Sequence, residues 1–111
     1  MKYEMLKKLV DAAKDKKAER VVVLDLQGKS DICDYQLICS AATDRQTKAI
    51  ASHIDKVCRA DLKLTPASIE GVQTGHWILL DYGSLMVHVF MGPMRDYYAL
   101  ESLWPGAIMN V

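Results

Sequence analysis

The sequence predicts an α/β (α+β) fold in which a mixed five-stranded sheet is flanked by helices. Runs of β-branched and apolar residues at 20–26 and 35–40 are typical of strands that are covered on both faces. Two more apolar segments, 77–81 and 85–90, are separated by the turn residues Tyr82-Gly83-Ser84 and indicate a hairpin. Helical patterns lie before, between and after these strands, which gives the mixed class.

Two helices of substantial length are expected. The first carries an apolar stripe at helical spacing, formed by Tyr3, Leu6, Val10 and Ala13. The second begins after Thr43, which we expect to cap it together with Gln46 as the reciprocal partner of a capping box. Its end is predicted near Leu64, because Thr65-Pro66 follows. Residues 67–71 then form a short strand that leads through a turn into the hairpin.

The hairpin is apolar on both sides, and this property directs the functional interpretation. Alternation places Trp77, Leu79 and Asp81 on one side of their strand and Ile78 and Leu80 on the other. A third, short helix at 94–103 is expected to turn Tyr97, Leu100 and Leu103 inward. Two long helices cover one face of the sheet well, so the other face is predicted to be thinly covered and available to a partner.

Composition limits the function classes. The 111 residues are expected to form one domain, 1–111, with a single core. Lys and Arg number 14, as do Asp and Glu, and this balance disfavours direct DNA binding or strong RNA binding. No apolar run reaches the roughly 20 residues of a membrane span, and residues 1–17 do not resemble a signal peptide. We therefore expect a cytoplasmic protein with reduced cysteines and no membrane contact.

Catalytic signals are weak. Asp25, Asp31 and Asp34 do not alternate along one strand, as the metal-binding carboxylates of nucleotidyl transfer usually do. No phosphate-binding glycine loop, cofactor motif or metal ligand set is visible. Asp81 and His88 lie on paired strands, where either a structural ion pair or an acid–base couple is possible. A binding protein is the favoured class, and a residual nucleotidyltransferase-type enzyme that uses the three aspartates is the alternative.

Three segments resemble the motifs of the ribosomal silencing factor family, RsfS, also called Iojap. They are DYQLICSAATDRQTKAIA (34–51), GHWILLDYGSLMVHVF (75–90) and RDYYALESLW (95–104). The resemblance implies a nucleotidyltransferase-like fold without catalytic acids. It also implies a cytoplasmic factor that binds the fourteenth protein of the large ribosomal subunit. Such a factor blocks docking of the small subunit and represses translation when nutrients are scarce.

The same resemblance implies a set of partner-facing residues: Trp77, Leu79, Tyr82, Tyr98, Glu101 and Trp104. Ribosomal RNA contacts are expected to be peripheral at most, and a homodimer through the same face is a competing use of it. One departure is Ala41-Ala42, which stands where family members often have glycine. Because alanine resists backbone angles that glycine accepts, the shape of this loop is in question.

Overall fold

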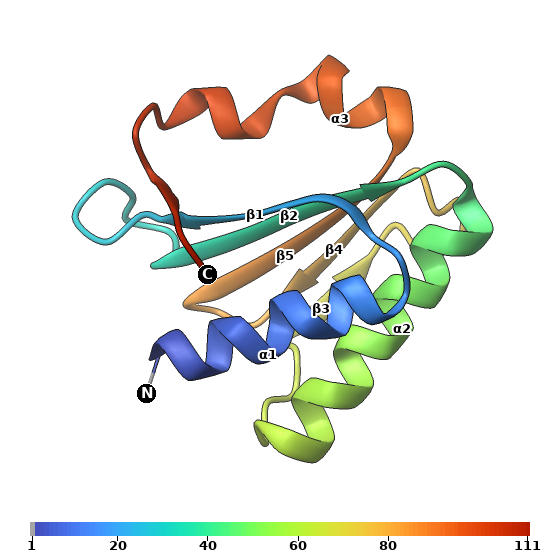
Figure 1. Cartoon of the computed structure of the whole chain (residues 1–111), viewed down its shortest axis with the longest axis horizontal. Coiled ribbons are helices and arrows are strands. Elements are labelled where there is room, and N and C mark those ends of the chain that lie inside the picture. The colour runs from blue at the N-terminus through green and yellow to red at the C-terminus, as the bar shows by residue number, and fades with distance from the viewer. Residues whose placement is uncertain (1) are drawn as a thin grey trace.

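A six-stranded mixed sheet forms the middle layer of the protein (Figure 1). The computed structural model describes residues 2–111. In chain order its elements are α1 (Lys2–Asp15), β1 (Glu19–Asp25), β2 (Tyr35–Ala41), α2 (Asp44–Asp61), β3 (Ser68–Glu70), β4 (Trp77–Asp81), β5 (Leu85–Met91), α3 (Gly92–Tyr98), the 3-10 helix η1 (Leu100–Leu103) and β6 (Ile108–Met109). The predicted mixed α/β class is confirmed.

The strand order is β3-β4-β5-β2-β1-β6, in which only β2 and β5 are parallel neighbours. The predicted count of five strands is wrong by one. The additional strand, β6, pairs two residues with β1, Val23 with Met109 and Leu24 with Ile108. A two-residue strand is too short to show alternation, so only its docking against β1 reveals it.

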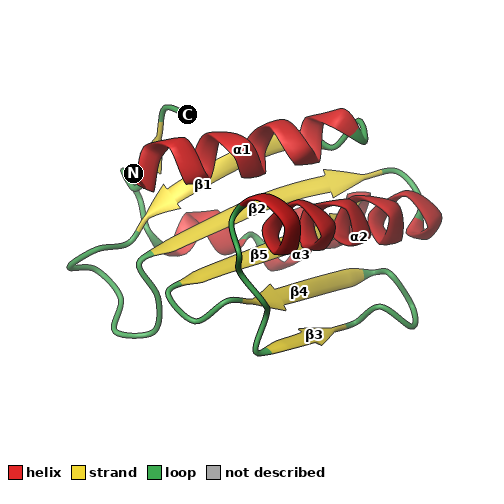
Figure 2. Ribbon diagram, turned by 90° about the horizontal axis from the view of Figure 1, so that it is seen from below, coloured by secondary structure: helices red, strands yellow, loops and turns green. Residues whose placement is uncertain are grey.

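Helices cover the two faces of the sheet unequally, as predicted. Figure 1 shows α1 and α2 on one side of the sheet and α3 with η1 on the other, and Figure 2 shows α1 and α2 lying along the strands. We call these sides the α1–α2 face and the α3 face. Ile78 and Leu80 are buried in the larger core on the α1–α2 face, whereas Trp77 packs on the smaller core of the α3 face. The predicted alternation of the hairpin is therefore confirmed.

The buried stripe of α1 differs from the prediction at one end. Leu6, Val10 and Ala13 are buried as expected, but Tyr3 is 53% exposed. Leu9, which is fully buried, replaces it in the stripe. Tyr3 lies in the first turn of α1, before Met5 and Leu6, which pack on the core.

The cap of α2 is half of the predicted capping box. The Thr43 hydroxyl oxygen accepts from the Gln46 backbone N–H at 3.2 Å, as expected. The Gln46 side chain does not return this bond. Its amide instead donates to the carbonyl oxygens of Lys16 and Lys17, at 3.3 and 3.2 Å, where the chain leaves α1. These carbonyls need donors because the helix has ended, and Gln46 thereby ties α2 to the end of α1.

The end of α2 also differs slightly from the prediction. The helix stops at Asp61 with Leu62 as its C-cap, not near Leu64. Lys63 adopts a left-handed φ of 56°, and the Leu64 N–H turns back to the Cys58 carbonyl at 2.9 Å. The reversal supplies a second donor to the Cys58 carbonyl before Pro66 is reached.

The prediction of a single C-terminal helix over 94–103 is wrong. The chain forms α3, breaks at Ala99 with φ 45° and ψ 47°, and continues as η1. Tyr97 and Leu103, which were expected inside, are 80% and 62% exposed. Arg95 takes an inward position instead and is only 2% exposed. The break changes the direction of the chain, so one helical stripe cannot describe both pieces.

Candidate partner-binding surface

Trp77 lies at the centre of an aromatic stack on the α3 face. It projects from β4, and its ring centroid is 4.9 Å from that of buried Phe90 and 4.5 Å from that of Tyr98. Tyr98 is 42% exposed and makes an edge contact with Tyr97, at 5.1 Å between centroids. We call these four side chains, Phe90, Trp77, Tyr98 and Tyr97, the aromatic ladder. It runs from the core of the α3 face to solvent.

A hydrogen bond to His88 holds the Trp77 ring in its orientation. The indole Nε1–H of Trp77 donates to Nδ1 of His88 at 3.1 Å. His88 is 5% exposed, and burial lowers the pKa of this imidazole to about 4. The ring is therefore neutral at pH 7, which leaves Nδ1 free to accept and places the proton on Nε2.

Asp81 and His88 do not form the pair that the sequence left open. Across the hairpin, Asp81 lies opposite Met86, and His88 lies opposite Leu79. Asp81 instead accepts from the backbone N–H of Gly83 at 2.8 Å, which stabilises the hairpin turn. Leu79 itself is partly exposed on the α3 face, on the same side of β4 as Trp77.

Trp104, the residue that follows η1, lies on the same face of the sheet. It is partly buried and packs, with Leu100, on the core that contains Phe90. Four of the six predicted site residues therefore form the surface of the α3 face: Trp77, Leu79, Tyr98 and Trp104. Tyr97, which is the most exposed ring of the aromatic ladder, was not predicted for this surface, because the helical pattern placed it inside.

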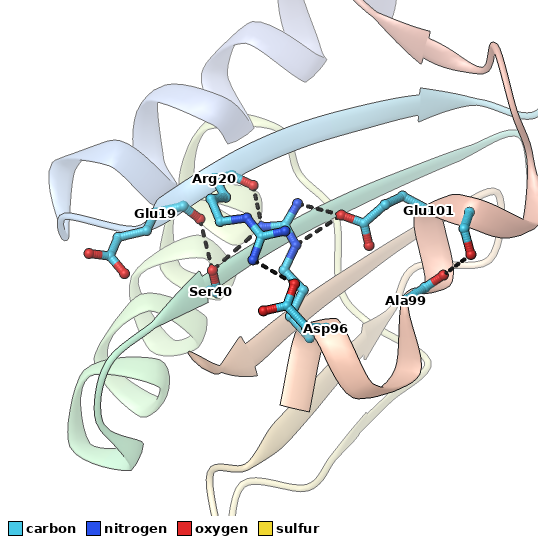
Figure 3. Close-up of polar contacts among 8 residues, drawn as sticks. Glu19, Arg20, Ser40, Asp96, Ala99 and Glu101 are labelled. Atoms are coloured by element: carbon cyan, nitrogen blue, oxygen red, sulfur yellow. Dashed lines mark hydrogen bonds and ion pairs between the residues drawn. The ribbon is translucent and has the colours of Figure 1, made fainter. Parts of the chain in front are cut away.

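Glu101 lies beneath this surface and points inward. Its carboxylate accepts from Nε and Nη2 of Arg95, at 2.9 and 2.7 Å (Figure 3). Burial opposes ionisation of Glu101, but the hydrogen bonds from Arg95, a backbone hydrogen bond and the positive charges of Arg95 and Arg20 together hold the pKa of the carboxyl below its usual value. Arg95 was not singled out by the sequence, since nothing local distinguishes a buried arginine from a surface one.

Tyr82 belongs to the opposite face of the sheet. It packs against the core under α1 and α2, and its hydroxyl lies 3.4 Å from the Asp55 carboxylate on α2. Burial, followed by a hydrogen bond with Cys58, raises the pKa of the Tyr82 phenol. The structure therefore does not bring Tyr82 together with Trp77. Extending the strand alternation by one residue beyond Asp81 would have predicted this side.

The other predicted chemical features lie apart from this surface. Asp25 accepts from the Gln27 N–H at 3.1 Å, as a turn residue does. Within residues 2–111, no three His, Cys, Asp or Glu side chains are arranged to hold a metal ion. The three cysteines are buried and form no disulfide, and burial raises the pKa of Cys39 to about 12. Ala41 and Ala42 have no left-handed backbone angles, so alanine fits this loop without strain.

No helix of the described chain has both the length and the apolar character that crossing a membrane requires.

Comparison with known proteins identifies the family. The model described as "Ribosomal silencing factor during starvation" (RsfS) matches residues 2–110. A ribosomal silencing factor RsfS from Halalkalibacterium halodurans is 41% identical over 94% of this chain and 88% of its own length. The mouse protein (Mus musculus) named "Mitochondrial assembly of ribosomal large subunit protein 1" is 28% identical over 86% of this chain and 43% of its own length. A crystal structure from Bacillus halodurans has a TM-score of 0.84 at 38% identity and covers 98% of this chain and 99% of that one. The chain therefore belongs to the ribosomal silencing factor (RsfS) family.

Proposed function

We propose that this protein is a ribosome-associated silencing factor that binds the large ribosomal subunit through the α3 face. The observation that carries the proposal is the stack of Trp77 and Tyr98, which leaves Tyr98 42% exposed over a thinly covered sheet face. Tryptophan and tyrosine dominate binding energy at protein interfaces because they bury a large rigid area with little entropy loss. The family assignment supplies the ribosome as the partner.

The mechanism is steric and regulatory. A bound silencing factor occupies the surface of the large subunit that the small subunit must meet, so fewer complete ribosomes form. The direct partner in this proposal is the fourteenth protein of the large subunit, and the effect is repression of translation under nutrient limitation, in the cytoplasm. The name of the mouse relative refers to the large ribosomal subunit, which supports this choice of subunit.

The contact residues we propose are those that share the α3 face: Trp77, Leu79, Tyr98 and Trp104. Equal numbers of acidic and basic residues fit a partner recognised mainly by apolar and aromatic contact. A homodimer through this face would compete with the ribosome, since both uses bury the same rings.

Sedimentation with separated ribosomal subunits on sucrose gradients tests this proposal. The protein should sediment with the large subunit alone and should lower the yield of complete ribosomes when small subunits are added. Trp77→Ala and Tyr98→Ala should each weaken binding by about 30-fold, because hot-spot aromatics contribute about 2 kcal/mol or more.

The matched control is Tyr3→Ala. This ring is also exposed, at 53%, but it lies on α1 at the opposite face of the sheet. We expect it to bind like the wild type. Wild-type affinity in both Trp77→Ala and Tyr98→Ala would remove the α3 face from the proposal. Failure of the wild-type protein to bind either subunit would remove the ribosome itself.

A further inference from the structure

Arg95 is a buried cation on α3, the helix that also carries Tyr98 of the proposed binding surface. Its side chain is 2% exposed, whereas arginine is almost never fully buried without partners. A charge removed from water is stable only when an opposite charge and further hydrogen bonds compensate it. The partners of Arg95 therefore indicate what this cation holds together.

Those partners come from three elements, β1, β2 and η1. Nε and Nη2 donate to the Glu101 carboxylate on η1, at 2.9 and 2.7 Å. Nη1 donates to the backbone carbonyl of Arg20 on β1 and lies 3.5 Å from the Ser40 hydroxyl on β2. Figure 3 shows Arg20, Ser40 and Glu101 converging from these three elements. The guanidinium thus joins the sheet to η1.

The sheet is shaped to provide one of these acceptors. The pairing of β1 with β2 is irregular between Glu19 and Val22, and Arg20 has a left-handed φ of 51°. Such a bulge interrupts the ladder and frees a carbonyl from strand pairing. The Ser40 hydroxyl also donates to the Glu19 carbonyl at 3.2 Å, which holds the bulge in place.

Arg95 and Glu101 bracket the exposed part of the aromatic ladder. Between them lie Tyr97, Tyr98 and Ala99, whose left-handed conformation separates α3 from η1. The Ala99 N–H donates to the Arg95 carbonyl at 2.8 Å. The ion pair therefore closes a short loop across a helix break, and Tyr98 is on that loop, stacked on Trp77.

We propose that the Arg95–Glu101 pair positions Tyr98 against Trp77, so that Glu101 supports binding through Arg95 and never touches the partner. One carboxylate oxygen of Glu101 is used by Arg95, and the other is buried without a partner among the described residues. The oxygen without a partner, Oε1, is buried, and Oε2 accepts both hydrogen bonds from Arg95. The consequence for ribosome binding rests on the proposed function, but the positioning of Tyr98 does not.

Hydrogen exchange of the backbone amides tests the positioning directly. Glu101→Gln keeps the shape of the side chain but removes the charge opposite Arg95. We expect exchange across residues 97–104 to accelerate by roughly tenfold or more, with α1 and α2 unchanged, because the buried pair closes this segment. Unchanged exchange in 97–104, or equal acceleration throughout the protein, would overturn the positioning role.

The chain offers a matched control in the same segment. Asp96 forms an ion pair with Arg20 at 2.9 Å, but the two side chains are 69% and 55% exposed. Exposed pairs contribute little because water and salt screen them. Asp96→Asn should therefore leave exchange in residues 97–104 as in the wild type. If Asp96→Asn accelerates exchange in residues 97–104 as much as Glu101→Gln does, the stability of this segment depends on its charge and not on the buried pair, which would contradict the inference.

A double-mutant cycle distinguishes a Glu101 that acts through Arg95 from a Glu101 that contacts the ribosomal partner directly. Binding to the large subunit is compared for the wild type, Glu101→Gln, Arg95→Met and the double variant, at a temperature where thermal melts show all four folded. If Glu101 acts through Arg95, Glu101→Gln weakens binding by roughly tenfold in the wild type and by less than about twofold in the Arg95→Met background. Equal loss in both backgrounds would assign Glu101 a direct contact and overturn the inference.

The two proposals fail in different ways. If the wild-type protein binds no ribosomal subunit, the proposed function fails, while accelerated exchange in Glu101→Gln still supports the positioning role. If Trp77→Ala weakens binding as expected but Glu101→Gln changes neither exchange nor binding, the positioning role fails and the proposed function stands.

Discussion

At the scale of single residues, His88 shows how a buried polar group is tied to the exposed surface. Its neutral imidazole accepts the indole N–H of Trp77, and its pKa lies near 4 because burial disfavours the charged form. In the unfolded chain the same group has its ordinary pKa of 6.5. Between these two values the unfolded state binds the proton and the folded state does not.

The contribution of His88 to the free energy of unfolding should therefore be constant above about pH 7 and should fall as the pH drops from 6.5 toward 4. We expect a loss of about 2 kcal/mol between pH 7 and pH 5, measured by urea unfolding. Glu101 contributes to the pH dependence only at lower pH, because its pKa lies below its usual value. His88→Phe should flatten the dependence in this window, whereas His76→Gln, at an exposed position, should keep it. A slope that persists in His88→Phe would contradict this account.

Gly71 is the second residue whose identity the structure requires. It has a left-handed φ of 84°, and a Cβ atom there would lie 1.9 Å from the carbonyl oxygen of Trp77. Since that obstacle is backbone, it cannot rotate away. Gly71→Ala should lower the free energy of unfolding by about 3 kcal/mol or more.

Gly28 provides the control for this substitution. It also has a left-handed φ, of 76°, but a Cβ there would meet nothing within 4 Å. Gly28→Ala should therefore cost about 1 kcal/mol, the strain of the left-handed backbone alone. Equal losses in thermal or urea unfolding would mean that the close approach to Trp77 is relieved at no cost.

At the scale of elements, the break between α3 and η1 decides which side chains of this segment are exposed. Ala99 adopts φ 45° and ψ 47°, a region that alanine rarely visits. Ala99→Gly should leave stability unchanged or raise it by up to about 1 kcal/mol, since glycine removes the strain but loses more entropy on folding.

The contrasting substitution is Ala49→Gly, at an exposed position inside α2. There the backbone is ordinary helix, and glycine should cost about 1 kcal/mol. Thermal melts of the two variants against the wild type check the pair. Destabilisation of Ala99→Gly as large as that of Ala49→Gly would show that the left-handed angle at Ala99 carries no strain.

At the scale of the whole molecule, the two cores are joined by the parallel pair β2 and β5. Leu37 and Val87 point into the α1–α2 core, while Ile38 and Phe90, on the same strands, point into the α3 core. If one core unfolds, the strands that also carry the side chains of the other core lose their cover on one face. We therefore expect unfolding in a single cooperative transition.

Two spectroscopic signals can test this cooperativity. Trp77 and Trp104 both report on the α3 core, whereas far-ultraviolet circular dichroism is dominated by α1 and α2. Their midpoints in urea should coincide. An earlier midpoint for tryptophan fluorescence would show that the α3 face opens as a separate unit.

Much of the fold follows from local patterns. The alternation of Trp77 and Ile78 placed them on opposite faces correctly, and the Thr43 side chain marked the start of α2, because each feature depends on neighbours in the chain. The surface was only partly predictable. Trp77 and Tyr98 do meet, as expected. Tyr97 was expected inside and is exposed, whereas Glu101 was expected to face a partner and points toward Arg95, because the helix ends at Ala99.

The sequence by itself determined the mixed α/β class, the hairpin, the two long helices and the family resemblance. The tertiary structure decided the sixth strand, the inward turn of Glu101 and the burial of Arg95. The reason is the range of the interactions. Alternation and capping act between residues a few positions apart, whereas Arg95 is held by a carbonyl 75 residues away that only folding brings to it.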